Sequence, residues 1–476
     1  MRYAKYKKTG IAWLPEVPDG WEVVPFKRVS EVKANLVHPS EYLSMPQVSP
    51  EQIEKVTGKL LLCKTVEESN VESDNHLFFK GQILYSKIRP LLNKVTIAPF
   101  NGLCSADMYP IETTQDVAYV KFAMLSRVFL NGVANAVADR VKMPKINKVE
   151  LGGVPIPLPP LSEQRVIAGY LDEKCEKVDA LVAAKERQVE LLKEMKQSMI
   201  ADAVTKGVGF NAEKQRRREA ENETSRTSRE KTKPSGIPWL PEVSEGWEVR
   251  KMKYLFTERS DKGHPNEPPL CSTQAYGVIP QSKYEGRVVV VDAKNRDQLK
   301  LVKKGDFVIS LRAFQGGIEI AHYQGIISAA YTILASKDEA YSQYFRWLFK
   351  SQPFIELLKT CVTGIREGQN INYSLLSRKQ LPLPPLAEQK VIVAHIEERA
   401  AKIDATISGL QKEISLLKEY RERLIADVVT GQRRVNSSTN SADNGSTNRV
   451  VGAAANNGGA AISAATKKGT AKGVAR

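Results

Sequence analysis

Cysteine is scarce and scattered in this 476-residue chain. Its five cysteines lie far apart, and no two of them form a Cys-x-x-Cys pair. We therefore expect neither a disulfide framework nor a zinc cluster, and free thiols fit a reducing cytoplasm. The five histidines are equally dispersed, and no two stand at the spacing that places metal ligands on one face of a helix. No metal site is expected.

Long apolar runs are also missing. No stretch approaches the roughly 18 consecutive apolar residues of a membrane-spanning helix, and the basic residues 1–8 have no apolar segment behind them. We therefore expect a soluble cytoplasmic protein with no membrane partner.

Catalytic motifs are absent as well. There is no Gly-x-x-x-x-Gly-Lys-Ser/Thr phosphate loop, which argues against an ATP-driven motor in this chain. The segment Asn266-Glu-Pro-Pro269 differs in order from the Asn-Pro-Pro-Tyr motif of adenine methyltransferases and lacks its aromatic residue, so we interpret it as a turn. The prediction is a chain that is not an enzyme, with no catalytic residue and no cofactor of its own.

What the sequence has instead is an internal repeat. Gly-Ile-x-Trp-Leu-Pro-Glu-Val and a following Gly-Trp-Glu-Val occur at residues 10–17 and 20–23, and both return at residues 236–243 and 246–249. Pro-Leu-Pro-Pro-Leu-x-Glu-Gln occurs at residues 157–164 and returns at residues 382–389, an offset of 225 that continues as far as residues 425–427. A repeat of this length predicts duplicated domains, because solenoid units have only about 20–50 residues.

A long helix is expected after each Pro-rich segment, because no proline occurs in residues 161–233 or after residue 385. Apolar residues recur with a seven-residue period in both segments, at Leu171, Val178, Val182, Val189, Leu192 and Met199, and at Ile396, Ile403, Ile407, Leu410, Ile414, Leu417 and Leu424. Lys185, Lys196 and Arg421 interrupt the pattern. We predict that the two helices form the core of a coiled coil with each other. The alternative is a pair of amphipathic helices packed on a globular core.

The direction of helix pairing follows from the distance that the linker between the helices can span. A helix over about residues 163–204 is about 60 Å long. A flexible linker over residues 206–234 spans only about 30 Å, so a parallel pair would require it to run back along the coil. We therefore predict an antiparallel pair with the two domains at opposite ends.

The predicted fold class is α+β: two similar mixed α/β domains separated by an antiparallel two-helix coiled coil, with an internal pseudo-two-fold repeat. The predicted segments are domain 1 (9–155), spacer helix 1 (156–205), a basic polar linker (206–234), domain 2 (235–380), spacer helix 2 (381–430) and a disordered low-complexity tail (431–476). The linker and tail contain much of the net charge of +16, so the overall charge alone is weak evidence for nucleic-acid binding.

Local patterns predict some elements inside the domains. Residues 95–98 and 103–105 flank Asn101-Gly102, which predicts a β-hairpin. Residues 307–311 follow a Gly-Asp turn and predict a strand. Helices are predicted over residues 117–137 and 342–360.

Polar and basic side chains follow predicted strand ends in both domains. They are Lys87, Arg89, Lys94, Arg140, Lys142, Lys145 and Asn147 in domain 1, and Arg312, Gln315, Arg366, Gln369, Asn370 and Asn372 in domain 2. Arg and Lys suit guanine O6 and N7, and Asn and Gln suit adenine N6 and N7, so we predict DNA binding by these loops. Each of these residues can equally be an ordinary exposed loop residue.

Four tryptophans occupy identical settings in the two copies: Trp13, Trp21, Trp239 and Trp247. They could stack on bases, but residues that read two different half-sites should differ between copies. We therefore interpret them as scaffold residues that pack the start of each domain onto its coil.

Together, the opening Trp motif, Gly-x-Ile-x-x-Ser-x-Ile-Arg-Pro at residues 81–90 and the Pro-rich motif before each helix resemble type I restriction-modification specificity subunits. The resemblance covers residues 10–430. It implies that each target recognition domain reads one half of a split site in double-stranded DNA and that the helices space the domains. It also implies docking of two DNA adenine methyltransferase subunits and of ATP-dependent restriction subunits, with S-adenosylmethionine, ATP and magnesium acting in those partners.

Domain 2 departs from the family pattern where Leu311-Arg-Ala-Phe replaces Ile88-Arg-Pro, which puts the contact role of Arg312 in question. Two other functions remain open. One is a partner-independent DNA-bridging or repressor-like protein. The other is a self-sufficient methyltransferase or nuclease, which activity of the purified chain alone would reveal.

Overall fold

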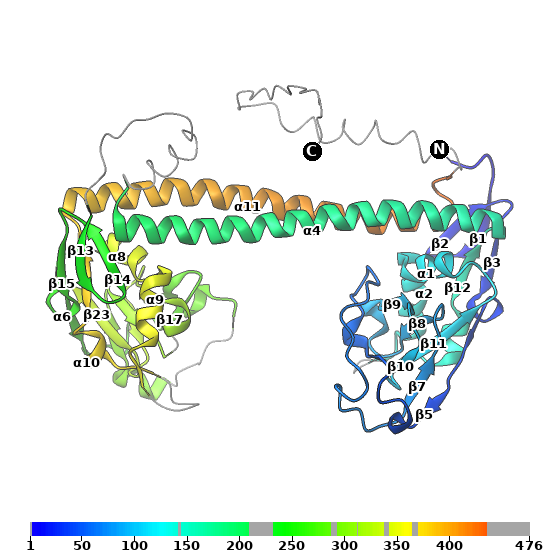
Figure 1. Ribbon diagram of the computed structural model, residues 1–476, viewed down its shortest axis with the longest axis horizontal. Helices are drawn as coiled ribbons and strands as arrows, with labels where there is room; N and C mark the ends of the chain where they lie inside the picture. The colour runs from blue at the N-terminus through cyan, green and yellow to red at the C-terminus, as the bar shows by residue number, and fades with distance from the viewer. Residues whose placement is uncertain are drawn as a thin grey trace, which may run out of the picture. The chain divides into compact units, whose positions relative to one another are not determined.

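The computed structural model describes residues 2–140, 144–208, 232–286, 293–311, 313–337, 342–363 and 370–435. The chain forms two compact units. Unit 1 combines the residues up to Ala183 with those from Ser415 onward, and unit 2 is Ala184–Ile414. Each unit contains one mixed domain and one part of each of two long helices, α4 (Leu161–Lys206) and α11 (Leu386–Val429) (Figure 1).

The domain of unit 1 is built mainly from short strands. These are β1 (Tyr6–Ile11), β2 (Leu14–Pro18), β3 (Glu22–Pro25), β4 (Ser30–Val32), β5 (Leu36–Val37), β6 (Gln47–Val48), β7 (Asn75–Phe78), β8 (Ile83–Ser86), β9 (Val95–Ile97), β10 (Gly102–Cys104), β11 (Met108–Thr113) and β12 (Pro155–Leu158). Its helices are α1 (Val117–Leu125), α2 (Arg127–Ala136) and α3 (Lys148–Gly153). The strands form two four-stranded sheets, β4-β11-β8-β9 and β5-β7-β10-β6, and the pairs β1-β2 and β3-β12.

Strand β8 shows how this domain is layered. All four of its residues are buried. Since alternate side chains of a strand point to opposite faces, β8 is covered on both faces. Ile83 and Tyr85 pack in a core that includes α1, α2 and the adjoining ends of α4 and α11. Leu84 points the other way, into a second cluster with Phe78 and Cys104.

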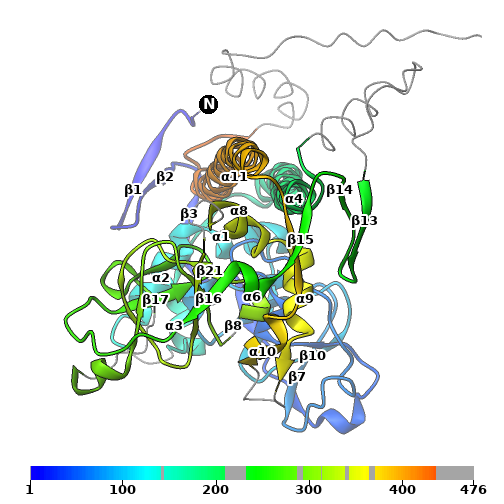
Figure 2. The same cartoon turned by 90° about the vertical axis from the view of Figure 1, so that its left-hand side faces the viewer.

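The domain of unit 2 repeats part of this plan. Its strands are β13 (Thr232–Ile237), β14 (Leu240–Ser244), β15 (Glu248–Lys251), β16 (Phe256–Arg259), β17 (Leu270–Thr273), β18 (Gly277–Pro280), β19 (Lys300–Val302), β20 (Phe307–Ile309), β21 (Glu319–Ile320), β22 (Gly325–Ile327), β23 (Thr332–Ser336), β24 (Val362–Thr363), β25 (Asn370–Ile371) and β26 (Gln380–Leu383). Its helices are α6 (Met252–Leu255), α7 (Ala313–Gly316), α8 (Ser342–Leu348), α9 (Gln352–Lys359) and α10 (Tyr373–Leu376) (Figure 2). Sheet β16-β23-β20-β21 has the same order as β4-β11-β8-β9, and β15-β26 corresponds to β3-β12.

The long helices pair antiparallel within each unit. In unit 1, Arg421 Nε lies 2.8 Å from Asp179 Oδ1. In unit 2, Lys185 pairs with Glu413, and Lys196 Nζ lies 2.7 Å from Asp404 Oδ2. As residue numbers rise along α4, those of their partners fall along α11. The three side chains that interrupt the heptads are therefore the cations of ion pairs between the helices.

The predicted apolar positions lie on the inner side of the helix pair. Leu171, Val182, Val189, Met199, Ile396, Leu410 and Leu424 are buried, and Val178, Leu192, Ile403, Ile407, Ile414 and Leu417 are half-buried. Leu171 and Leu424 also belong to the domain core of unit 1, whereas Val189 and Leu410 are buried outside the domain cores of unit 2. The helices thus pack on a domain near their ends and on each other elsewhere. The predicted α+β fold with two similar domains and an antiparallel coiled coil is confirmed.

One local prediction was wrong. Strands form on both sides of Asn101-Gly102, but they do not form a hairpin, because β9 pairs with β8 while β10 pairs with β7 and β6. The Asn101 side chain instead accepts a 2.8 Å hydrogen bond from Lys80 N. The two regions predicted to be helical are confirmed, each as two helices, with Ser126 and Ser351 as the N-caps of the second.

The predicted linker and tail fall mostly outside the described residues, at 209–231 and 436–476. The start of the predicted tail packs in unit 1, where Tyr6 Oη donates a 2.8 Å hydrogen bond to Gly431 O and Val435 is buried.

Of the helices that the structure describes, none is by itself long and apolar enough to cross a membrane. The bent pair α1 and α2 meets that criterion jointly, and most of its apolar side chains, such as Phe122 and Phe129, are buried in the core of unit 1.

Candidate nucleic-acid interface

The structure brings together the two basic loops predicted in domain 1. One loop follows β8, and the other lies between α2 and α3. Arg89 N donates a 2.9 Å hydrogen bond to Pro144 O, and Ile146 N donates another of 2.9 Å to Lys87 O. Because backbone bonds join the loops, their side chains form one polar surface although the two segments are far apart in the sequence.

Arg89 is the most available side chain on this surface. It is exposed and has left-handed backbone angles, with φ of 44°, as the N-cap of the 3-10 helix Pro90–Leu92. Such a conformation is uncommon for a residue other than glycine. Within the described part of the chain, its guanidinium makes no hydrogen bond or ion pair. It is therefore available for a charged ligand.

Lys87 is half-buried beside Arg89. Its Nζ lies 5.3 Å from the centroid of the Tyr109 ring, a cation–π distance. Burial, assisted by the charges of Lys87 and Lys148, lowers the pKa of the nearby His76. The lowered pKa disfavours the charged form of His76, beside the positive charges of Lys87 and Lys148.

Four of the other five candidates in domain 1 are described by the structure, and all four bond within the domain. Lys94 Nζ donates a 2.5 Å hydrogen bond to Pro50 O, and Lys145 Nζ lies 3.0 Å from Asp107 Oδ1. Arg140 pairs with Glu150 and also donates to Lys145 O. Asn147 caps α3, accepting a 2.9 Å hydrogen bond from Glu150 N. These contacts give the four side chains a role in shaping the loops.

In domain 2, Gln315 is exposed on α7 and Asn370 is exposed on β25. Asn372 caps α10 and accepts a 3.2 Å hydrogen bond from Leu375 N. Asn147 and Asn372 are related by the offset of 225, so the repeat preserves a helix cap. Lys142, Arg312, Arg366 and Gln369 lie outside the described residues.

The tryptophan interpretation is confirmed for the second Trp of each motif. Trp21 is buried and its Nε1 donates a 3.0 Å hydrogen bond to Glu163 at the start of α4. Trp247 is also buried, and its Nε1 donates a 2.8 Å hydrogen bond to Glu388 at the start of α11. Sequence reasoning missed the two glutamates, although their place in the repeated Pro-Leu-Pro-Pro-Leu-x-Glu-Gln motif was a signal for them.

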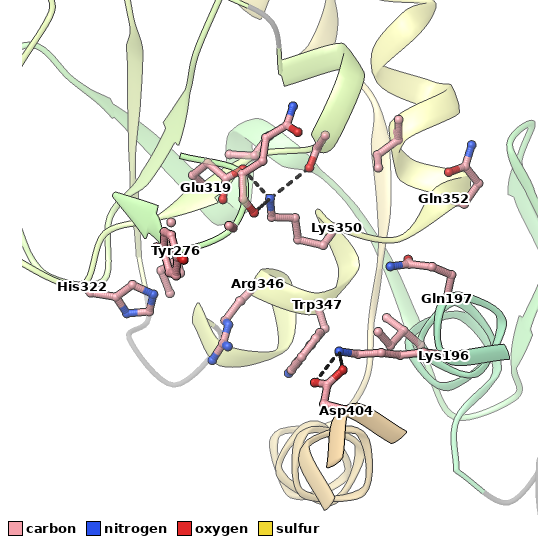
Figure 3. A pocket seen from close by; sticks show the side chains of 18 residues that line it. Lys196, Gln197, Tyr276, Glu319, His322, Arg346, Trp347, Lys350, Gln352 and Asp404 are labelled. Atoms are coloured by element: carbon pink, nitrogen blue, oxygen red, sulfur yellow. Dashed lines mark hydrogen bonds and ion pairs between the residues drawn. The ribbon is translucent and has the colours of Figure 1, made fainter. Parts of the chain in front are cut away.

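Unit 2 also contains a polar cavity of about 630 Å³ between its domain and its helix pair (Figure 3). Two ion pairs line it, Lys350–Glu319 and Lys196–Asp404. Burial raises the pKa of Glu319 to about 7, although Lys350 opposes the shift. In the described ranges, no cluster of three or more His, Cys, Asp or Glu side chains could hold a metal ion.

The sequence pattern of the type I restriction modification DNA specificity domain matches residues 18–191 and 244–416. The chain belongs to this family. Each match covers one recognition domain and part of the long helix that follows it. The prediction of a type I specificity subunit, a recognition subunit without a catalytic role, is thereby confirmed.

Individual relatives agree with this assignment. The specificity subunit is 37% identical over 190 residues to the type I restriction enzyme EcoDI specificity subunit of Escherichia coli, covering 40% of this chain and 43% of that protein. It is 23% identical over 444 residues to the type I restriction enzyme MjaVIII specificity subunit of Methanocaldococcus jannaschii, covering 88% and 94%. The first match thus spans less than half of its relative, and the second nearly all.

A solved structure supports the fold. A chain from a study of complex assembly and conformational transition in the type I restriction-modification system superposes with a TM-score of 0.62 at 16% identity. The superposition covers 88% of this specificity subunit and 99% of that chain.

If each domain reads one half of a split DNA site, replacing Arg89 with Ala should weaken recognition of one half-site only. We expect a loss of about 1–3 kcal/mol if the guanidinium contacts a base. Fluorescence anisotropy with duplexes altered in one half-site at a time measures this. Lys8→Ala is the matched control, because it removes one exposed positive charge on β1, outside both loops. An equal loss on all sequences would instead identify Arg89 as a phosphate contact.

Proposed function

We propose that this specificity subunit recognises a bipartite site in double-stranded DNA and docks the other subunits of a type I restriction-modification complex. Each domain would read one half-site, and the helix pair would set the unread gap between them. The observation that carries the proposal is the fold itself: two similar domains on one antiparallel helix pair, in a chain of the DNA specificity family.

Exposed apolar side chains on the two helices are consistent with a partner that binds at two equivalent places. Leu191 and Met195 on α4 have exposed fractions of 47% and 51%, and Leu416 and Tyr420 on α11 have 54% and 45%. The offset of 225 relates Leu191 to Leu416 and Met195 to Tyr420. Each unit therefore exposes one copy of the same apolar pair, which suits two identical partner subunits.

The charge of α4 favours a protein partner over DNA. Between residues 163 and 205 there are nine acidic and seven basic residues. We infer that the partners are two DNA adenine methyltransferase subunits, with ATP-dependent restriction subunits joining the complex. S-adenosylmethionine, ATP and magnesium would be bound by those subunits.

Leu191→Asp and Leu416→Asp should each remove one methyltransferase subunit from the complex. A carboxylate at an apolar contact must be desolvated without a partner, so we expect at least about tenfold weaker binding at the altered copy. Native mass spectrometry of the reconstituted complex measures the stoichiometry, and the double variant should bind neither subunit.

Gln411→Asp is the matched control, because it lies five residues before Leu416 and so on the opposite side of α11. Full occupancy in both leucine variants would contradict the docking surface. If reconstitution with the host methyltransferase gave no complex at all, a partner-independent DNA-bridging protein would become the better explanation.

Deleting residues 436–476 should leave the recognised sequence unchanged. This segment contains five basic residues and one Asp, so its loss should reduce salt-sensitive, nonspecific DNA affinity. The truncation keeps Gly431 and Val435, which pack in unit 1. Methylome sequencing and a salt titration with random DNA measure the two effects. Loss of the target motif would show that the tail takes part in specific recognition.

A further inference from the structure

A glycine turn in domain 1 reaches the helix pair. Residues 53 and 60 form a β-bridge, and the chain between them turns at Val56 and Gly58, both with positive φ. A Cβ on Gly58 would lie 2.2 Å from Val95 O, so no other residue fits there without a shift of the backbone. The turn therefore holds the carbonyls of Val56 and Thr57 in a fixed place.

Arg421 of α11 binds this turn. Its Nη1 donates a 3.3 Å hydrogen bond to Val56 O, and its Nη2 donates another of 3.3 Å to Thr57 O. Its Nε lies 2.8 Å from Asp179 Oδ1 on α4. Arg421 is only 5% exposed, and a buried cation persists only where its surroundings compensate the lost hydration. One guanidinium thus joins the turn and both helices, all within unit 1.

The equivalent position in unit 2 keeps the ion pair. The offset of 225 places Lys196 at the position of Arg421 and Asp404 at the position of Asp179. Lys196 Nζ pairs with Asp404 at 2.7 Å, which corresponds to the Arg421–Asp179 pair.

The contact with the domain differs. Domain 2 also has a glycine turn, at residues 274–277 between β17 and β18. There a Cβ on Gly277 would lie 2.8 Å from Ile320 O, and Ile320 belongs to β21, the counterpart of β9 in the sheet order. This turn and Lys196 line the 630 Å³ cavity (Figure 3). A lysine ammonium is a compact charge, whereas a guanidinium offers five donors in a planar fork.

We propose that Arg421 is a positioning residue that fixes domain 1 on the helix pair, and that Lys196 gives domain 2 only the interhelical half of this contact. The consequence for recognition rests on the proposed function. The rigid link keeps the loop of Arg89 at one orientation to the helices. The link would thereby restrict the complex to a single gap length between the half-sites.

Arg421→Lys separates the two roles of this side chain. It keeps a cation for Asp179, as Lys196 does for Asp404, but it cannot bridge both carbonyls. We expect amide hydrogen exchange in residues 54–59 to rise about tenfold or more, because hydrogen bonds to a charged group are lost. Lys196→Ala is the matched control and should leave exchange in residues 54–59 unchanged. Unchanged exchange in the Arg421→Lys variant would overturn the link.

Methylome sequencing tests the consequence for recognition. The Arg421→Lys variant, expressed with its methyltransferase, should methylate the parental half-sites at the parental gap and also at gaps one base pair longer or shorter. Increased exchange with a single unchanged gap would overturn the positioning role. An unsplit motif in the parent would refute the proposed function, whereas the exchange experiment would still decide the link.

A reciprocal variant covers the case in which Arg421→Lys does not fold. Lys196→Arg places a guanidinium beside residues 274–277 and should slow amide exchange there by several-fold. Slower exchange supports the assignment of the link to the guanidinium, and unchanged exchange overturns it.

Discussion

A specificity subunit with four residues inserted into both long helices should recognise the same two half-sites separated by one or two more base pairs. Four helical residues add about 6 Å, and DNA rises about 3.4 Å per base pair. We place the insertions after Ala183 in α4, between Leu181 and Leu192, and after Ile414 in α11. The bases on either side should not change, because the loops that read them are untouched.

The interhelical ion pairs show why both helices must be lengthened. Asp179–Arg421 lies on one side of the insertion points, and Lys185–Glu413 and Lys196–Asp404 lie on the other. The double insertion keeps all three pairs. An insertion in α4 alone moves one set of partners apart by about one helical turn and should give a less stable protein.

Methylome sequencing of cells that carry the double insertion with the methyltransferase partner measures the gap directly. The insertion in α4 alone is the control, because it changes the alignment of the two helices with each other. An unsplit motif in the parent protein would refute the spacer function of the helices. Altered half-site bases in an active variant would show that the helices take part in reading DNA.

The architecture could be predicted because its signals are long and repeated. The heptads extend over several turns of both helices, so three charged interruptions did not hide them. Those interruptions were the least predictable part of the coil. Arg421 bonds to Val56 and Asp179, which lie far before it in the sequence, and only the folded chain brings these residues together.

The candidate site was predicted at the level of loops. Both basic segments of domain 1 meet in space, but the sequence gives no sign of which cations already have partners. Lys94 bonds to a carbonyl 44 residues away, a contact without a local pattern. Asn147 could have been identified as a cap, since Asn followed three residues later by Glu is a capping-box pattern.

The Asn101-Gly102 hairpin failed for a related reason. A turn dipeptide indicates that the chain reverses, but it does not determine which strands pair afterwards. Strand pairing depends also on which side chains are buried together. Cys104 on β10 and Phe78 on β7 belong to the same buried cluster of unit 1, and these two strands pair.

Replacing Trp21 or Trp247 with Ala should destabilise the unit that contains it by about 3–5 kcal/mol, the usual cost of a buried Trp or Phe truncated to Ala. Both side chains are 1% exposed, and each truncation also removes the hydrogen bond to Glu163 or Glu388. Trp→Phe should cost less, because it keeps most of the buried ring. Urea unfolding followed by amide exchange measures the loss in each unit separately.

The two tryptophans also test whether the units unfold independently. Trp21→Ala should accelerate exchange in unit 1 and Trp247→Ala in unit 2, because each Trp belongs to the core of its own unit. Tyr254→Ala, at an exposed position in unit 2, is the control and should change stability by less than about 0.5 kcal/mol. A loss below about 1 kcal/mol in either Trp→Ala variant would contradict the scaffold role. Equal acceleration in both units would show that the shared helices make the chain unfold as one cooperative body.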